Sequence, residues 1–454
     1  MGSSDLGKGV RRLPPSLWCI GACWMAVAGT ARSAEEPLSS VVEPLVRHAT
    51  SSPDGSAAAT FVPRDFGRAT NELPIGVFDS GIGGLTVLEA ILSLDAFDNR
   101  TLRPGADGRP DFENERFVYF GDQANMPYGN YPREGNEAYL KELILKDAVF
   151  LLGRRCWPTA DAASPVLDKP PVKAIVIGCN TATAYGLADI RAAIREWGIP
   201  VFVVGVVEAG ARGVLESARD FVARDEAIAV LATVGTCNSM AYPKAIGSAF
   251  GRAGRRAPKV VQHGFADLAA VIEGDPAVAT TTSVERVIAV DLRGMMDDYR
   301  RSGGSWPVGS VVLGCTHFPL VREEILAELG RLRRHEADGI RPFEPLIAEQ
   351  VDVIDPAGLT ARELFRTLAL ERLRAPASPG GAAPEDKENL FFMSVPCLQA
   401  GDDGAWARAK FGRSPGRLDV EDTRVVPMTV GLLPEPSLNL IRTRLPQVWS
   451  SLGR

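Results

Sequence analysis

Short hydrophobic runs recur along the chain, and several of them stop at a glycine that polar residues follow at once. The two clearest read VVLGCTHFPL, from Val311 to Leu320, and AIVIGCNTATA, from Ala174 to Ala184. Runs of this length bounded by glycine are typical of buried strands, and a parallel strand delivers the next residues to the carboxyl edge of its sheet, where ligands bind. We therefore expect Cys179 and Cys315 to lie at such edges, and two of them suggest two thiols at one site.

A third run has the same form but ends in a glycine-rich turn. It reads PIGVFDSGIGGLTVL from Pro74 to Leu88, which predicts a strand, then Asp79 and Ser80, then the start of a helix. Backbone amides at a helix start favour an anion, for example a carboxylate. The alternative is a simple strand-to-helix turn in which Asp79 or Ser80 caps the helix.

Hydrophobic strands alternate with amphipathic helices over most of the chain, which favours parallel sheets of the doubly wound α/β class. The expected strands cover 116–120, 174–178, 200–206, 227–234, 259–262, 311–313, 351–354 and 390–394. The expected helices cover 136–153, 266–273, 283–301, 322–334 and 358–373.

Length and composition are those of an ordinary globular protein. The 454 residues suffice for two or three domains, with 45% hydrophobic and 23% charged residues. A net charge of −6 argues against a nucleic-acid surface, because phosphate contacts need clustered Lys and Arg. The seven cysteines show no CxxC or Cys/His spacing, so neither a disulfide framework nor a metal site is expected.

The first 34 residues have the features of a secretory signal peptide. A basic start precedes the apolar stretch 17–29, and Ala31 and Ser33 offer small residues for cleavage. This predicts a periplasmic or secreted protein whose mature chain has no membrane span. The alternatives are a wrongly assigned start or an ordinary buried helix, either of which leaves the protein in the cytoplasm. Residues 35–73, rich in Ser, Ala, Pro and charge, are expected to be a flexible lead-in.

These motifs together resemble the glutamate racemases of the cofactor-independent aspartate/glutamate racemase superfamily. The resemblance covers roughly residues 74 to 400, and GCNTA and GCTHFPL are highly specific as a pair. The matching segments follow the family's order and read IGVFDSGIGGLTVL (75–88), VYFGDQANMPYG (118–129), VIGCNTATA (176–184), VVGVVEAGA (203–211), VGTCNS (234–239) with Tyr242, and VVLGCTHFPL (311–320).

The resemblance implies two flavodoxin-like lobes that face each other across an active-site cleft, with the second lobe inserted in the first. On this basis residues 74–184 are the first part of lobe 1, 185–312 are lobe 2, and 313–430 are the second part of lobe 1. The tail, 431–454, leaves the family pattern and has no assigned role.

Racemisation removes a Cα proton and returns one on the opposite face, which two acid/base groups on opposite sides of the carbon serve best. The site must also stabilise carbanion character at Cα. Many racemases use pyridoxal phosphate for this purpose, but no lysine stands out here and the resemblance implies no cofactor. It implies instead that Cys179 takes the proton from the D isomer and Cys315 from the L isomer of glutamate.

Each thiol needs an ionisable neighbour, because free cysteine is mostly protonated near neutral pH. His317 is the expected partner of Cys315 and Asp79 that of Cys179, while Glu273 aligns with an acidic residue near the family's site. Loop capping is the alternative role for the Ser, Thr and Asn residues among the expected substrate contacts. Those contacts are Ser80, Pro127, Tyr128, Gly129, Asn180, Thr181, Thr236 and Thr316.

Some features depart from the family. Gln262-His263-Gly264 stands where a small residue and Cys-Pro are usual, and 98–115 and 155–171 are unusual insertions. Glutamate racemases supply D-glutamate for peptidoglycan precursors in the cytoplasm, whereas an exported copy would expose its thiols to oxidation.

Other functions therefore stay open. One is racemisation of aspartate, of another amino acid or of a hydantoin; another is decarboxylation, for which a single cysteine is expected. The third is a periplasmic amino-acid-binding protein that keeps the cleft without turnover. A homodimer is the assembly considered.

Overall fold

The computed structural model describes residues 37–67, 70–217, 220–376, 388–397, 409–418 and 420–452. Leu38–Arg454 is one compact unit. The predicted signal peptide, 1–34, lies outside the described residues and stays a prediction. Among the helices of the described ranges, none combines the length and the hydrophobicity that a bilayer crossing requires.

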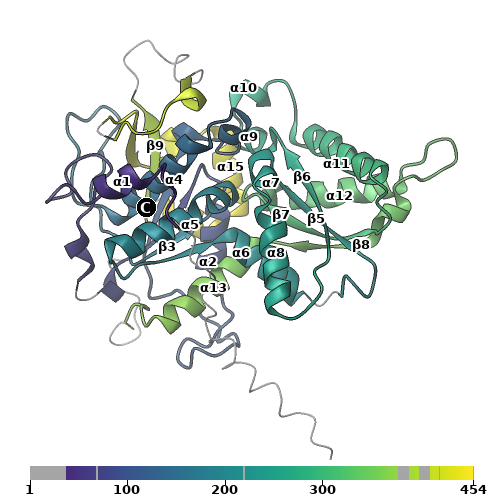
Figure 1. Ribbon diagram of the computed structural model, residues 1–454, viewed down its shortest axis with the longest axis horizontal. Helices are drawn as coiled ribbons and strands as arrows, with labels where there is room; N and C mark the ends of the chain where they lie inside the picture. Colours follow the sequence, from purple (N-terminus) through teal and green to yellow (C-terminus); the bar gives the residue numbers. More distant parts are fainter. Residues whose placement is uncertain are drawn as a thin grey trace, which may run out of the picture. The chain divides into compact units, whose positions relative to one another are not determined.

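The strands of the described residues form two sheets, of which β3 and β9 mark the first and β5 and β7 the second in Figure 1. The first sheet has six strands, in the order β10-β9-β2-β1-β3-β4. All neighbouring strands are parallel except the edge pair, in which β10 is antiparallel to β9. The strands are β1 Ile75–Asp79, β2 Phe117–Gly121, β3 Ala174–Ile177, β4 Phe202–Gly205, β9 Leu390–Pro396 and β10 Thr423–Pro427.

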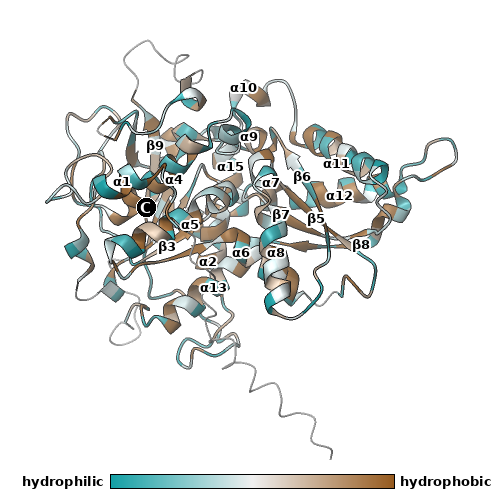
Figure 2. Ribbon diagram, in the orientation of Figure 1, coloured by the Kyte–Doolittle hydropathy of each residue, from teal (hydrophilic) through white to brown (hydrophobic). Residues whose placement is uncertain are grey.

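The second sheet has four strands, in the order β6-β5-β7-β8, and all of its pairs are parallel. Hydrophobic residues dominate its central strands, as the brown colour of β5 and β7 shows in Figure 2. The strands are β5 Ala227–Thr233, β6 Lys259–Phe265, β7 Val308–Gly314 and β8 Ile347–Ile354.

Helices connect the parallel strands. Those that matter for the site are α2 Leu85–Leu92, α4 Glu137–Leu152, α5 Asn180–Trp197, α6 Val206–Glu216, α9 Leu268–Glu273, α11 Val284–Arg301, α12 Arg322–Arg334 and α13 Pro356–Leu370, with the short helix η3 Gln123–Asn125. The other α-helices of the described residues are α1 Glu43–His48, α3 Asn130–Arg133, α7 Val234–Asn238, α8 Ala241–Arg252, α10 Pro276–Ala279, α15 Glu435–Arg444 and α16 Pro446–Leu452.

Helices cover both faces of the six-stranded sheet because side chains alternate along each strand. Val77 of β1 belongs to a core that includes residues of α2 and α13. Its neighbour Phe78 belongs to a separate core that includes residues of α4 and α5. This is the doubly wound α/β arrangement that the sequence predicts, with the antiparallel β10 added at one edge.

Strand pairing corrects the predicted lobe boundaries at 184/185 and 312/313. Strand β4 pairs with β3, so the chain stays in the first sheet as far as Gly205. Strands β7 and β8 both belong to the second sheet, so the chain returns only after Ile354. Hydrophobic pattern shows that a strand is buried but not which strand it pairs with, which explains the error.

Residues before Pro74, predicted to be a flexible lead-in over 35–73, are packed where the structure describes them. Leu45 and Phe61 are fully or almost fully buried, in one core with α4 and α5. The indole nitrogen of Trp197 donates to the carbonyl of Val46 at 3.0 Å. The apolar residues that punctuate this polar stretch therefore anchor it to the first lobe.

The tail beyond 430 also packs on the domain. Helix α16 contacts α2, where the Glu89 carboxylate accepts from the amides of Gln447 and Val448. Helix α15 contacts α9 of the second lobe. The tail therefore touches both lobes through its two helices.

Candidate active site

One cavity gathers most of the residues that the sequence singles out. Both thiols line it, Cys179 from the end of β3 and Cys315 from the end of β7, so the two sheets contribute to a single site. The lining residues are Asp79, Ser80, Met126, Pro127, Tyr128, Gly129, Cys179, Asn180, Thr181, Thr233, Ala269, Cys315, Thr316 and His317.

Cys179 stands at the start of helix α5. Its sulfur accepts from the amide of Ala182 at 3.4 Å and lies 3.8 Å from the hydroxyl oxygen of Ser80. Burial, and then the nearby charge of Asp79, raise the pKa of Cys179 above its ordinary value. Without substrate, Cys179 is therefore a protonated thiol that can donate a proton.

Cys315 has a different neighbour. Its sulfur lies 3.6 Å from Nδ1 of His317, and Nε2 of His317 lies 2.5 Å from a carboxylate oxygen of Glu273. Burial lowers the pKa of His317, but hydrogen bonds to Cys315 and Glu273 outweigh it and raise that pKa well above its ordinary value. A charged imidazole beside a thiol is the arrangement that activates cysteine as a base or nucleophile.

Asp79, the expected partner of Cys179, is fully buried at the end of β1. Its carboxylate accepts from the amide of Gly81 at 2.9 Å, from Thr316 at 2.9 Å and from Ser80 at 3.3 Å. Burial raises its pKa, against the opposing charge of His317. The Ser80 hydroxyl thus contacts both Asp79 and Cys179, and this contact joins the predicted pair.

The glycine-rich turn after β1 binds carboxylates of the protein itself. The Gly81 amide donates to Asp79, and the Ile82 amide donates to Glu273 at 2.9 Å. Its glycines are needed for close approach, since a Cβ on Gly83 would lie 2.5 Å from His317. At these two amides, the predicted anion is therefore a carboxylate of the protein itself, from Asp79 and from Glu273.

Polar groups of the cavity lining are held by neighbours that do not line the cavity. Oδ1 of Asn180 accepts from the Tyr242 hydroxyl at 2.6 Å, whereas the buried Nδ2 of Asn180 has no hydrogen-bond partner among the described residues. The hydroxyls of Thr181, Thr233 and Thr236 lie 3.0 Å from one another. Thr181 and Thr233 line the cavity; Thr236, predicted to bind substrate, is fully buried and supports them.

Tyr128 is anchored by two buried acidic side chains. Its hydroxyl lies 2.5 Å from Asp122 and 2.7 Å from Asp147. A phenol has one proton to donate, so two ionised carboxylates cannot both be satisfied by it. Burial, followed by the charge of Asp122, raises the pKa of Asp147 well above its ordinary value, so Asp147 carries the second proton.

Sequence reasoning missed several residues of this site. Met126, Thr233 and Ala269 line the cavity, and Gln123 donates to Glu273. Thr233 is the last residue of β5 and Gln123 lies two residues after β2, so the reasoning that singled out Cys179 could have found them. Glu273 does not line the cavity; it is buried and reaches the site through His317.

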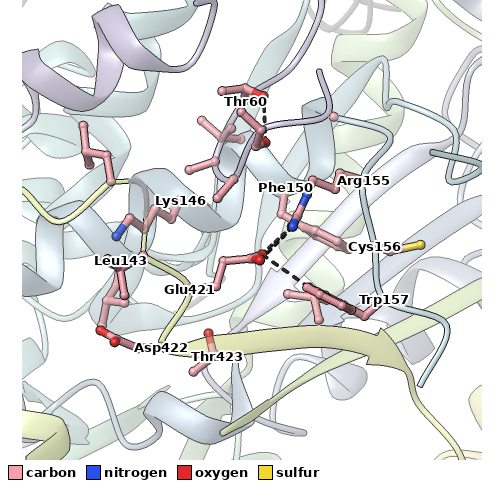
Figure 3. A pocket seen from close by; sticks show the side chains of 18 of the residues that line it. Thr60, Leu143, Lys146, Phe150, Arg155, Cys156, Trp157, Glu421, Asp422 and Thr423 are labelled. Carbon is pink, nitrogen blue, oxygen red and sulfur yellow. Dashed lines mark hydrogen bonds and ion pairs between the residues drawn. The ribbon is translucent and has the colours of Figure 1, made fainter. Parts of the chain in front are cut away.

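A second cavity lies away from the thiols, lined by α4, the insertion that begins at Arg155, and residues 413–425 (Figure 3). Its charges are already paired: Arg155 forms an ion pair with Glu421, which also accepts from the Trp157 indole nitrogen. In the described part of the chain, no three His, Cys, Asp or Glu side chains are grouped to hold a metal ion.

The fold and the first cavity define an α/β protein of two parallel-sheet lobes with a pair of thiols at one site. Residues 154–364 match the Asp/Glu/hydantoin racemase family. A glutamate racemase of Lactobacillus johnsonii is 32% identical over 304 residues, which are 66% of this chain and 83% of that protein. One from Thermus thermophilus is 32% identical over 307 residues, 68% of this chain and 84% of that protein. The chain belongs to the Asp/Glu/hydantoin racemase family.

Among solved structures, glutamate racemase isoform RacE1 from Bacillus anthracis is similar to this chain. It is 25% identical with a TM-score of 0.48, and the match covers 77% of this chain and 99% of that one.

Proposed function

We propose that this protein interconverts L- and D-glutamate by proton transfer at Cα between two thiols, without a cofactor. One observation carries the proposal: Cys179 and Cys315 line the same cavity although they follow strands of different sheets. Family relatives that are 32% identical are glutamate racemases, which supports glutamate as the substrate.

With L-glutamate, Cys315 acts as the base. Its thiolate, beside the charged His317, takes the Cα proton, so the C–H bond breaks and its electron pair stays on carbon. The thiol of Cys179 then gives its proton to the opposite face, which forms the new C–H bond and leaves a Cys179 thiolate. With D-glutamate the same two steps run in reverse, and Cys179 is the base.

Asp79 assists Cys179 in this scheme through Ser80. The serine hydroxyl is in contact with both the sulfur and the carboxylate, at 3.8 and 3.3 Å. Cys179 is also the N-cap of the 18-residue helix α5, whose aligned backbone amides favour negative charge at that end. The helix amides stabilise the thiolate that forms when Cys179 loses its proton, whereas the charge of Asp79 favours the protonated thiol that serves as the acid.

Substrate carboxylates need donors, and the cavity offers them. The Nδ2 group of Asn180 is a buried donor that a carboxylate oxygen would satisfy. The hydroxyls of Thr181 and Thr233 are next to it along the lining, and Ser80 and Thr316 are beside the thiols. Pro127, Tyr128 and Gly129 complete the wall, where the anchored Tyr128 fixes the turn.

Export of the protein is a second part of the proposal and depends on residues 1–34. In a periplasmic or secreted location, D-glutamate would form outside the cytoplasm and a reductant would be needed to keep the thiols reduced. Fusing residues 1–34 to a reporter tests export, and retention in the cytoplasm would support the cytoplasmic alternative and the usual peptidoglycan role. A homodimer is the expected assembly, which light scattering of the purified protein tests.

Incubation with single enantiomers in deuterated water tests the reaction. We expect L- and D-glutamate each to reach a 1:1 mixture with one deuterium at Cα, read by chiral chromatography and mass spectrometry. Deuteration of aspartate alone would move the substrate to aspartate. Binding of glutamate without deuteration would contradict the proposal and favour a binding protein.

A further inference from the structure

Three donors hold the buried carboxylate of Glu273. Oε1 accepts from the Ile82 amide at 2.9 Å and from Nε2 of His317 at 2.5 Å. Oε2 accepts from the side-chain amide of Gln123 at 2.6 Å. Each oxygen of the carboxylate therefore has a partner, and Gln123 supplies the partner of the oxygen that faces away from His317.

Gln123 reaches Glu273 from the other lobe. It lies in η3, directly after β2 of the six-stranded sheet, whereas Glu273 ends α9, which follows β6 of the four-stranded sheet. The backbone on either side of Gln123 is fixed: the Asp122 amide donates to the Asp79 carbonyl at 2.8 Å, and the Ala124 amide donates to Ser394 at 2.9 Å. Gln123 is thus a rigidly placed donor.

The main chain of Glu273 is held as well, by the tail. The Ser437 hydroxyl donates to the Glu273 carbonyl at 3.0 Å, and Ser437 is fully buried. The next residue, Gly274, has a φ of +76° and packs so closely on Pro436 that a Cβ there would lie 2.8 Å from its ring. The end of α9 is therefore fixed from both sides.

A buried carboxylate and imidazole can exist in two states. In the ion pair the proton is on the imidazole, and in the neutral pair it is on the carboxyl group. Each donor to the carboxylate stabilises its ionised form and so favours the ion pair. The other titratable groups near this pair are Cys315 on the same loop, Asp79 at the end of β1, Cys179 and Tyr119. The side-chain amide of Gln123 donates to this carboxylate at 2.6 Å, and its other contact, with the sulfur of Met126, is longer at 3.9 Å.

We infer that Gln123 and Ser437 are positioning residues that hold the Glu273 carboxylate in contact with His317, and thereby keep His317 charged beside Cys315. The inference deepens the proposed function, because the charged His317 is what prepares Cys315 as a base. Neither residue lines the cavity, so neither contacts substrate directly, and the shorter hydrogen bond of Gln123 is the one to Glu273.

Nuclear magnetic resonance of the histidine Cε1 carbons tests this in the full-length protein, which has only four histidines. We expect His317 in the Gln123→Met variant to lose its charge about one to two pH units lower than in the wild type, the shift produced by losing one hydrogen bond to a charged group. Ser437→Ala is expected to move His317 in the same direction by less. Gln262→Met, which removes a side-chain amide that contacts Met240 instead, is the matched control and should leave His317 unchanged.

Turnover gives a second measurement. Gln123→Met is expected to lower kcat at least tenfold with little change in KM, whereas a role in substrate binding would raise KM. If glutamate racemises but neither Gln123→Met nor Ser437→Ala alters His317 or kcat, the inference is wrong. If the histidine shifts occur in a protein that does not racemise glutamate, the positioning role stands and the proposed function fails.

Discussion

Nε2 of His317 lies 2.5 Å from Oε1 of Glu273, and both side chains are almost completely buried. The other ring nitrogen of His317 is 3.6 Å from the sulfur of Cys315. The charged imidazole therefore has one N–H directed at the carboxylate and the other at the thiol. The protonation state of the second thiol, Cys179, depends instead on burial and on the charge of Asp79, which both raise its pKa.

The His317–Glu273 pair should make stability depend on pH. The pKa of His317 is raised in the folded protein, so its stabilisation is fully present below about pH 6.5 and is lost as pH rises through the folded value. We expect the difference in unfolding free energy between wild type and Glu273→Gln to shrink as pH rises, by at most about 1.4 kcal/mol per pH unit. Urea unfolding at pH 6, 7.5 and 9 measures it; a difference that grows with pH would contradict the assignment.

A second prediction concerns the close contact between Gly83 of the glycine-rich turn and His317. Gly83→Ala places a methyl group 2.5 Å from Nδ1 of His317 and 2.7 Å from the Thr316 hydroxyl, so either both side chains or the turn itself must shift. We expect activity to fall by roughly 10²-fold, the size expected when a catalytic group is displaced by about an ångström. Steady-state kinetics measures the loss.

The control for this variant is Gly294→Ala, in the middle of α11, where an added Cβ meets no atom within 4 Å. It should leave activity unchanged and raise stability by about 0.5–1 kcal/mol, because alanine favours a helix interior. Equal activity of the two variants would show that His317 tolerates displacement.

The acidic pair around Tyr128 gives a third prediction. Because the pKa of Asp147 is raised on folding, its stabilisation is present at low pH and is lost as pH rises through the folded value. In Asp147→Asn the amide donates to the Tyr128 oxygen without a titrating proton, so we expect higher thermal stability than wild type at pH 8. Calorimetry at pH 5 and pH 8 tests this; a larger deficit of the variant at pH 8 would refute the protonated Asp147.

Much of the fold could be predicted from the sequence, because buried strands and strand-end glycines leave local patterns. Cys179, Cys315 and His317 were found in this way, and the structure brings them to one cavity. Local patterns do not reveal which strands are neighbours, because pairing joins segments that are far apart in sequence. The lobe boundaries show this, since β4 was assigned to lobe 2 but pairs with β3 in the first sheet.

The contacts that hold Glu273 in place could not be predicted from the sequence either, because they come from distant segments. Gln123 and Glu273 are 150 residues apart, and Ser437 lies in a tail without a recognisable motif. Packing of 37–67 depends on a few apolar residues within polar surroundings, and its composition alone indicated a flexible segment.

The most direct measurement compares Cys179→Ser and Cys315→Ser with Cys156→Ser, a buried cysteine outside the site. Racemisation of each glutamate enantiomer is followed at pH 8 in the presence of a reductant. The account predicts a loss of roughly 10²–10⁴-fold in the first two variants, the size of one general acid–base contribution, and none in the third. Near wild-type racemisation by either of the first two would contradict the claim that both thiols move the Cα proton.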